Sequence, residues 1–282
     1  MWNFILLLCA FTPLALAALP FYGLNYGMNT VNCPSLEDVK RDFQALKPYT
    51  NRVRIFTLVA CQQGDLVLRA TQELGMRAYL GMWVSGDPNV YEKELEALKS
   101  LVNTHDLSNV DGIIVGSEAL YRNETTPQQM VNYISRTQEL VHPKKIPVAT
   151  ADVYYKFPPE VVKQIDFLMM NAFPYWEGVT VDQGATKLIE HYDSLVSEAQ
   201  GKQVRISETG WPTSGPNFGE SVPSPQNQAT YLRDVLEKVR ARNIDMIWFA
   251  AIDEPYKGGI ESAWGILDAN RHLKPDLKPI LS

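Results

Sequence analysis

Eight short apolar runs alternate with longer amphipathic patterns along this chain, and the alternation predicts an α/β protein, a single-domain (β/α)8 TIM barrel. Two further observations favour this fold. From residue 20 onward no linker rich in Gly, Ser or Pro interrupts the pattern, and α/β barrels commonly use about 250 residues as one unit. An open, doubly wound sheet is the alternative fold. However, Gly23–Gly27 lacks the G-x-G-x-x-G turn that usually follows the first strand of such a sheet.

The strands are expected where β-branched and aromatic residues cluster in short runs. These runs are residues 21–26, 52–56, 77–83, 112–116, 147–151, 167–171, 203–207 and 246–251. Helical periodicity follows most of them, and a helix over 35–46 would begin with the Ser-x-x-Asp capping pattern of Ser35 and Asp38. Further helices are expected over 90–102, 127–141, 186–200 and 225–240.

The first residues predict a signal peptide, residues 1–17, followed by a catalytic barrel domain, residues 18–282. An apolar run extends from Phe4 to Leu16, and Ala15 and Ala17 have the small-x-small spacing of a cleavage site. The run is shorter than a membrane span of about 20 residues, and Pro13 interrupts it. The mature protein is therefore expected to be soluble and secreted, with no membrane span.

Export makes the cysteines and the sequon interpretable. Cys9 leaves with the signal peptide, so Cys33 and Cys61 remain as an even pair in an oxidising compartment. A disulfide between them is favoured over two free buried thiols. Asn123-Glu124-Thr125 is a possible glycosylation site, which places Asn123 in a surface loop.

Composition excludes several classes of function. The chain has 26 Lys and Arg against 32 Asp and Glu, a formal charge of −6, so it lacks the basic field that nucleic acid or anionic lipid requires. It has no H-E-x-x-H, G-x-S-x-G, Walker or C-x-x-C motif. The four histidines lie outside the strand ends and are interpreted as surface or helix-end residues; they are His105, His142, His191 and His272. We therefore expect no metal and no organic cofactor.

Two glutamates stand at equivalent places in the predicted barrel. Glu118 and Glu208 each follow a β-branched run, at the carboxyl end of a strand, where barrel enzymes build their sites. Structural salt bridges, for instance with Arg54 or Lys257, are the alternative explanation. Function is favoured because glycoside hydrolysis needs a protonated and an ionised carboxyl, about 5 Å apart when the configuration is retained. Like charges at this distance raise the pKa of one carboxyl.

Aromatic side chains follow the strands on the same rim. They are Tyr26, Trp83, Tyr121, Tyr154, Tyr175, Trp176, Trp211 and Tyr256. A sugar ring can stack its C–H face on such side chains, although about half of them are expected to pack the loops over the barrel instead. The rim therefore suits an uncharged carbohydrate.

Three segments carry a resemblance to a known family: VGSEALYR (115–122), ISETGWP (206–212) and DEPYK (253–257). Together they resemble glycoside hydrolase family 17, in its fungal cell-wall branch, and the resemblance extends from Phe21 to about Leu267. It implies action on β-1,3-glucan with retention at the cell wall, Glu118 being the acid/base and Glu208 the nucleophile. Glu254 and Lys257 match auxiliary site residues. Cys33 and Cys61 are similar to a disulfide-forming pair in fungal relatives.

The substrate-binding residues expected on the rim are Tyr26, Arg54, Trp83, Ser117, Tyr121, Asp152, Tyr154, Asn171, Tyr175, Trp211, Glu254 and Lys257. Two features differ from the wider group. Ser117 stands where much of the larger clan has Asn, and the short segment 173–184 leaves no room for the subdomain of plant members. The acceptor side of the cleft is therefore expected to be open.

The predicted function is a cell-wall β-1,3-glucanosyltransferase that works by double displacement, with a β-1,3-glucan oligo- or polysaccharide as its partner. A hydrolytic endo- or exo-β-1,3-glucanase is the first alternative. A retaining enzyme for another β-glucan or a mannan and a non-catalytic glucan-binding barrel are the others, and the last is disfavoured because both glutamates are present. We expect a monomer.

Overall fold

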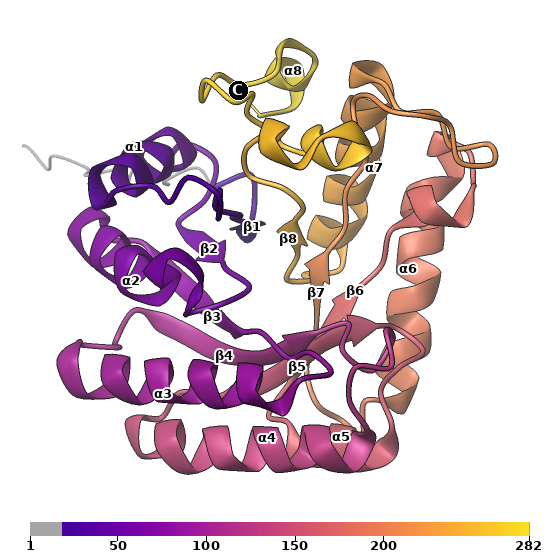
Figure 1. Cartoon of the computed structure of the whole chain (residues 1–282). Coiled ribbons are helices and arrows are strands. Elements are labelled where there is room, and N and C mark those ends of the chain that lie inside the picture. The colour runs from indigo at the N-terminus through magenta and orange to yellow at the C-terminus, as the bar shows by residue number, and fades with distance from the viewer. Residues whose placement is uncertain (1–18, 282) are drawn as a thin grey trace, which may run out of the picture.

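The structure is a computed structural model that describes residues 19–281 (Figure 1). The predicted signal peptide, residues 1–17, lies outside the described residues, and Cys9 with it. Within residues 19–281, no helix combines the length and the apolar character needed to cross a membrane.

Eight parallel strands form the predicted barrel, in the order β7-β6-β5-β4-β3-β2-β1-β8. Their bounds are β1 Gly23–Asn25, β2 Arg52–Arg54, β3 Arg77–Met82, β4 Val110–Ser117, β5 Val148–Val153, β6 Leu168–Asn171, β7 Val204–Glu208 and β8 Ile247–Trp248. A parallel bridge between Ile206 and Met246 joins β7 to β8 and closes the ring. All eight predicted strands are confirmed. β8 is shorter than expected because the Ala250 amide donates to the carbonyl of Trp264, outside the sheet, although the Ala251 amide still donates to Asn25 of β1.

The helices surround the strands (Figure 1). Their bounds are α1 Leu36–Leu46, α2 Gln63–Leu74, α3 Pro88–Thr104, α4 Pro127–Val141, α5 Pro159–Gln164, α6 Val181–Glu198, α7 Pro225–Ala241 and α8 Lys278–Leu281. The five predicted helices are confirmed, and Ser35 caps α1 in a full capping box with Asp38. Sequence periodicity missed α2, α5 and α8. Only a short 3-10 turn, Pro174–Glu177, lies between β6 and α6, so a large subdomain is absent there, as predicted.

Alternation along the strands separates two apolar cores. On β4, Ile113 and Val115 pack toward the helices, whereas Ile114 joins a small cluster inside the barrel with Phe167 and Met169. Successive side chains of a strand point to opposite faces, so Asn171, two residues after Met169, shares the inward face of β6. The strand pattern thus places polar side chains at the carboxyl end of the barrel interior.

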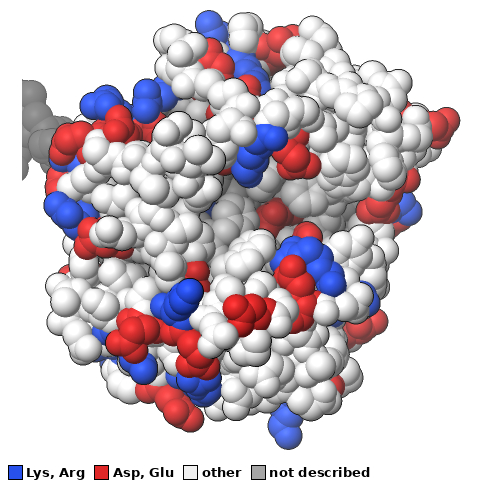
Figure 2. All heavy atoms as spheres, in the orientation of Figure 1, with Lys and Arg blue, Asp and Glu red and all other residues white. Residues whose placement is uncertain are grey.

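Charged side chains are interspersed over the face in Figure 2, and neither sign forms a large area on it. This agrees with the small formal charge of −6 and with the charge pattern expected for a protein that binds an uncharged ligand.

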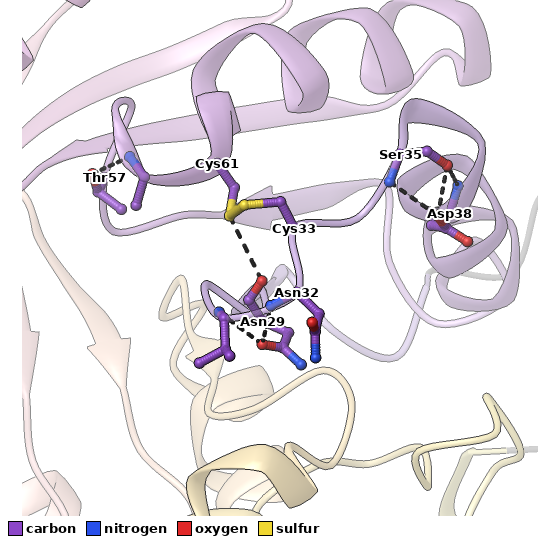
Figure 3. The surroundings of a disulfide bond; sticks show 9 residues. Asn29, Asn32, Cys33, Ser35, Asp38, Thr57 and Cys61 are labelled. Atoms are coloured by element: carbon purple, nitrogen blue, oxygen red, sulfur yellow. Dashed lines mark hydrogen bonds between the residues drawn. A yellow bond between two sulfur atoms is a disulfide. The ribbon is translucent and has the colours of Figure 1, made fainter.

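Cys33 and Cys61 form a disulfide, with their Cα atoms 5.3 Å apart, so the alternative of two free thiols is wrong (Figure 3). The bond connects the loop after β1 to the 3-10 turn Ala60–Gln62 after β2. Its sequence separation is 28 residues, for which the chain-entropy model gives a stabilisation of about 3 to 4 kcal/mol. Nearby, the Asn29 side chain accepts hydrogen bonds from the amides of Val31 and Asn32, which shapes the same loop.

Candidate active site

Five strands end in polar residues that meet at one end of the barrel. Asn25, Arg54, Ser117, Asn171 and Glu208 are the last residues of β1, β2, β4, β6 and β7. All five are buried, and a buried polar group destabilises the fold unless it has hydrogen-bonding partners. Contacts among these five residues supply many of those partners, and the Asn25 side chain also donates to the Ser207 carbonyl at 2.8 Å.

Glu208 is the centre of this network. Its Oε1 accepts hydrogen bonds from Arg54 Nη1 at 2.7 Å, Asn171 Nδ2 at 2.8 Å and Ser117 Oγ at 2.9 Å. Arg54 is held in turn by Asn25 Oδ1 at 2.8 Å. The salt bridge considered as an alternative to function is therefore present, but it lies at the wall of a cavity. It fixes one oxygen of the Glu208 carboxyl, and a nucleophile requires such a fixed position.

Glu118 follows β4 directly and has a left-handed backbone, with φ of +58°. Asn171 Nδ2 donates to its Oε1 at 3.1 Å while also contacting Glu208. Asn171 Nδ2 is 3.1 Å from an oxygen of Glu118 and 2.8 Å from an oxygen of Glu208. The distance between these two oxygens therefore cannot exceed the sum of the two hydrogen-bond lengths. This spacing matches the close carboxyl pair of retaining enzymes and is too short for the inverting arrangement.

The pKa of Glu118 is raised, chiefly because burial disfavours its charged form and secondly because the Glu208 charge lies nearby. The hydrogen bond from Asn171 and the charges of Arg122 and Arg54 oppose this rise. The sequence analysis named the like charge as the cause, and the structure places burial ahead of it. A raised pKa keeps Glu118 protonated closer to neutral pH, as a general acid requires.

Arg122 is a site residue that the sequence analysis missed. Its Nη1 lies 3.7 Å from Glu118 Oε2, and its guanidinium carbon lies 5.0 Å above the centre of the Trp83 ring. Its Nη2 also donates to the Ser117 carbonyl at 2.8 Å. The only signal in the sequence was its position four residues after Glu118, within one turn of chain. Arg122 thus connects the acid/base candidate to an aromatic wall of the cleft.

We predict that Arg122→Met moves the alkaline limb of the kcat/KM profile to higher pH. The Arg122 charge lowers the pKa of Glu118, so its loss lets this pKa rise further and keeps the acid protonated over a wider range. At the optimum, kcat/KM should change by no more than about fivefold, because a partly exposed ion pair contributes about 1 kcal/mol or less. The measurement is a pH–rate profile on a laminari-oligosaccharide.

Arg136→Met is the matched control for this variant. Arg136 also stacks on an aromatic ring, Tyr91, and pairs with a carboxylate, Glu92, but it lies on α4, away from the strand ends. Its pH profile should equal that of the parent protein. An alkaline limb that stays in place in Arg122→Met would contradict the assignment.

Asp152 holds the loop after Glu118 and lines neither cavity, so its contact with substrate stays a prediction. It has no exposed surface, and its Oδ2 accepts from the Leu120 amide at 3.0 Å. Burial raises the pKa of Asp152 to about 7, against the opposing backbone hydrogen bonds. It therefore positions the turn that carries Glu118.

Two cavities meet at the carboxylate pair. The β6-side cavity, of about 420 Å³, is lined by residues that follow β4, β5 and β6, with Phe249, Glu261 and Trp264. The β2-side cavity, of about 680 Å³, is lined by residues that follow β1 to β4 and β8. Glu118, Glu208 and Phe249 line both cavities. The carboxylates therefore stand in the middle of a continuous cleft with an arm on either side.

The predicted aromatic residues divide into two groups. Tyr121 and Tyr154 line the β6-side cavity, and Trp83 lines the β2-side cavity. Tyr175 and Trp211 are wholly buried against each other, with ring centroids 5.3 Å apart, and neither lines the two cavities. Their contact with substrate stays a prediction.

Tyr26 is also buried, and its contact with substrate stays a prediction. It packs edge-on against Phe43, and its hydroxyl donates to Asp42 at 2.5 Å. The number of buried rings agrees with the expectation that some rim aromatics pack the loops.

Glu254 and Lys257 lie together in the β2-side cavity, and Lys257 Nζ donates to Glu254 Oε2 at 2.7 Å. The Tyr256 hydroxyl donates to the other carboxylate oxygen. A Cβ at residue 27 would lie 2.0 Å from Oε1 of Glu254, so a glycine is required at Gly27 for this carboxylate to occupy its place.

Several lining residues lay beyond the sequence prediction. Tyr155, Phe173, Trp176, Phe249 and Trp264 all line the β6-side cavity. Trp176 was noticed as a rim aromatic. Phe249 lies inside the predicted strand 246–251 and Trp264 lies on a loop that follows no predicted strand end, so neither gave a positional signal.

His191 corrects the interpretation of the histidines. It is buried on α6, stacks on Tyr154 with centroids 3.8 Å apart, and contacts the Glu177 carboxylate through Nε2 at 2.8 Å. It thereby supports the wall of the β6-side cavity from behind.

Two remaining predictions concern modification and metals. Asn123 is exposed in the turn after β4, and its glycosylation stays a prediction. Within residues 19–281, no group of three His, Cys, Asp or Glu side chains is arranged to hold a metal ion.

A barrel whose fourth and seventh strands end at paired glutamates defines a glycoside hydrolase. A family model described as the BtgE/BtgC glycoside hydrolase domain matches residues 23–265. Two solved structures of a Rhizomucor miehei β-1,3-glucanosyltransferase, one named as a member of glycoside hydrolase family 17 and one an active-site mutant in complex with laminaritriose, are 57% and 56% identical to this chain. Each covers 91% of this chain and 96% of its own, with TM-scores of 0.89 and 0.90. The chain belongs to the BtgE/BtgC glycoside hydrolase domain family, within glycoside hydrolase family 17.

More distant relatives carry other names. A glucan 1,3-beta-glucosidase of Schizosaccharomyces pombe is 31% identical over 265 residues, which cover 87% of this chain and 82% of the relative. A probable glucan endo-1,3-beta-glucosidase (btgC) of Aspergillus fumigatus is 30% identical over 288 residues. That alignment covers 91% of this chain but 42% of the Aspergillus protein, so this chain spans less than half of that relative.

Proposed function

We propose that this protein is a retaining glycosidase of β-1,3-glucan whose main reaction is glucanosyl transfer. The observation that carries the proposal is the carboxylate pair at the middle of a two-armed cleft. Glu208 is held by Arg54, Ser117 and Asn171, while the pKa of Glu118 is raised. One carboxyl is thereby set up to attack and the other to donate a proton.

The reaction proceeds in two displacements. In the first, a Glu208 oxygen bonds to the anomeric carbon, the bond from this carbon to the glycosidic oxygen breaks, and Glu118 gives its proton to that oxygen. In the second, Glu118 takes a proton from the incoming hydroxyl, whose oxygen displaces Glu208 from the anomeric carbon. Two inversions restore the β configuration.

The identity of the second nucleophile decides between transfer and hydrolysis. A sugar hydroxyl gives transfer, and water gives hydrolysis. The β6-side cavity favours a sugar, because Tyr121, Tyr155 and Trp176 present exposed rings beside the carboxylates on which an acceptor can stack. The short segment 173–184 borders the same cavity and leaves it open, which also supports the β6-side cavity as the acceptor side. High identity to the Rhizomucor β-1,3-glucanosyltransferase also supports transfer.

Hydrolysis is the second candidate function, and the glucosidase names of the Schizosaccharomyces and Aspergillus relatives favour it. We propose that either reaction takes place outside the cell, at the cell wall, which is where the predicted signal peptide would direct the protein.

Time-resolved product analysis on laminaritetraose in H₂¹⁸O tests the proposal. Transfer predicts products longer than the substrate, with ¹⁸O absent from their new linkages. Hydrolysis predicts shorter products that carry ¹⁸O at the new reducing end. Because transfer also releases a shorter leaving saccharide, the deciding result is the longer product: its absence at every substrate concentration would rule out transfer as the main reaction. A first product in the α configuration would rule out retention.

A parallel panel of polysaccharides tests the substrate class. β-1,3-Glucan, mixed-linkage β-glucan, cellulose and β-mannan are compared at equal mass. Activity confined to the last two would reject β-1,3-glucan as the substrate.

A further inference from the structure

Two exposed aromatic rings lie side by side at the outer end of the β6-side cavity. Trp176 lines that cavity and is 40% exposed, while Phe218, on the loop between β7 and α7, is 45% exposed. Their ring centroids are 5.4 Å apart and their planes are nearly perpendicular, at 82°. Phe218 does not line the cavity itself, so the aromatic surface continues past the cavity on a second loop.

The loop that carries Phe218 is firmly held. Phe218 and Ser221 exchange two backbone hydrogen bonds of 3.0 and 2.9 Å, and the Glu220 amide donates to the Gly178 carbonyl at 2.9 Å. Gly219 has φ of +55°, and a Cβ on it would lie 2.9 Å from Gly178 Cα. The loop after β7 and the loop after β6 are therefore in backbone contact.

Two buried aromatics complete this support. The Tyr175 hydroxyl donates to the Pro216 carbonyl at 2.6 Å, and Trp211 Nε1 donates to the Val222 carbonyl at 2.9 Å. Both side chains are buried, and they fix the two ends of the segment that presents Phe218. A ring held in this way stays exposed where a free loop could fold it against the surface.

Exposed apolar side chains that are fixed beside a binding cleft indicate a ligand, because the exposure of each ring to water is unfavourable by about 25 cal/mol per Å². Three acidic groups lie near the rings, since Glu177 and Glu261 line the cavity and Glu220 is exposed on the loop, whereas Lys187 is a basic neighbour of Glu177. The acidic groups disfavour an anionic ligand. Flat rings with hydrogen-bonding neighbours suit the C–H face of an uncharged sugar.

We propose that Phe218, together with Trp176, forms a distal subsite for β-1,3-glucan that extends the β6-side arm of the cleft. This inference rests on the proposed function. The subsite contacts sugar units that a short oligosaccharide does not reach, so it selects longer acceptor or substrate chains. Its occupant is the same chain that passes the carboxylates, because the subsite is continuous with the cavity that Trp176 lines.

Phe218→Ala tests the subsite, with kcat/KM measured on laminari-oligosaccharides of three to eight units. Short substrates should react as with the parent protein. Beyond a threshold length, kcat/KM should fall about three- to tenfold, through KM, because one stacking surface is lost. Phe218→Trp should restore the length dependence, since it replaces one flat ring with another.

Val222→Ala is the matched control, because Val222 is 42% exposed on the same loop and only its backbone carbonyl is used to hold Trp211. It should show no dependence on chain length. A decrease in Phe218→Ala that is equal at all lengths, or no decrease at any length, overturns the distal subsite. Inactivity of the parent protein on every laminari-oligosaccharide would instead overturn the proposed function.

Discussion

Replacement of Glu208 with Gln should lower kcat on laminari-oligosaccharides by about 10⁴-fold or more, which corresponds to about 5.5 kcal/mol of transition-state stabilisation. The amide has nearly the same shape as the carboxylate, but it cannot form the covalent bond to the anomeric carbon. Asn171 and Ser117 can still donate to the amide oxygen at the positions they occupy now. The cleft should therefore keep its affinity for glucan while turnover is lost.

Kinetics and calorimetric binding of laminaritriose to Glu208→Gln check this result together. Glu261→Gln is the control, because Glu261 is an exposed carboxyl that lines the β6-side cavity and is not part of the buried network. It should retain near-normal kcat. Turnover of Glu208→Gln within tenfold of the parent protein would exclude Glu208 as the nucleophile, and binding without turnover in the parent protein would support the non-catalytic barrel.

Replacement of Glu118 with Gln should have a large effect that depends on the leaving group. On a natural glucan the leaving oxygen needs a proton, so kcat/KM should fall about 10² to 10⁴-fold. A dinitrophenyl β-glycoside releases dinitrophenolate, which leaves without protonation, so formation of the glucosyl-enzyme from this substrate should continue. Because Glu118 also activates the second nucleophile, the glucosyl-enzyme should then accumulate.

Added azide discriminates the roles of the two glutamates. Azide needs no general base, so it should release the accumulated intermediate of Glu118→Gln as a β-glycosyl azide. Glu208→Gln serves as the control, because it forms no intermediate and should give no β-azide. If Glu118→Gln is equally inactive on both leaving groups, or yields no azide product, Glu118 is not the acid/base. The alkaline limb of the parent pH profile should also disappear in Glu118→Gln, because the raised pKa that produces it belongs to the Glu118 carboxyl.

The strand positions and the two glutamates were predictable because they depend on local pattern. β-Branched runs such as Gly-Ile-Ile-Val form strands through side-chain packing on a pleated surface. A carboxylate at the end of such a run is an uncommon event that stands out in the sequence. Arg54, Ser117 and Asn171 were predicted on the same ground, as polar residues at strand ends, and all three now contact Glu208.

Contacts between distant loops were not predictable, because they depend on distances that only the closed barrel sets. Tyr175, Trp211 and Tyr154 looked alike in the sequence, as aromatics after strands. In the structure the first two are buried under the loop after β7, while Tyr154 stacks on His191 from α6 and lines the cavity. The disulfide was partly predictable. The even cysteine count favoured a bond, but only the fold places the two Cα atoms 5.3 Å apart.

The sequence by itself determined the barrel and the positions of the two glutamates at the carboxyl ends of β4 and β7, because hydrophobic periodicity and strand-end residues can be recognised in consecutive residues. The tertiary structure alone decided which aromatic rings face the cleft, that Asp152 supports the turn after Glu118, and that Phe218 lies beside Trp176. Packing decides these, because the orientation of a loop side chain follows from the neighbours that fill the space around it, and those neighbours come from parts of the chain far away in sequence.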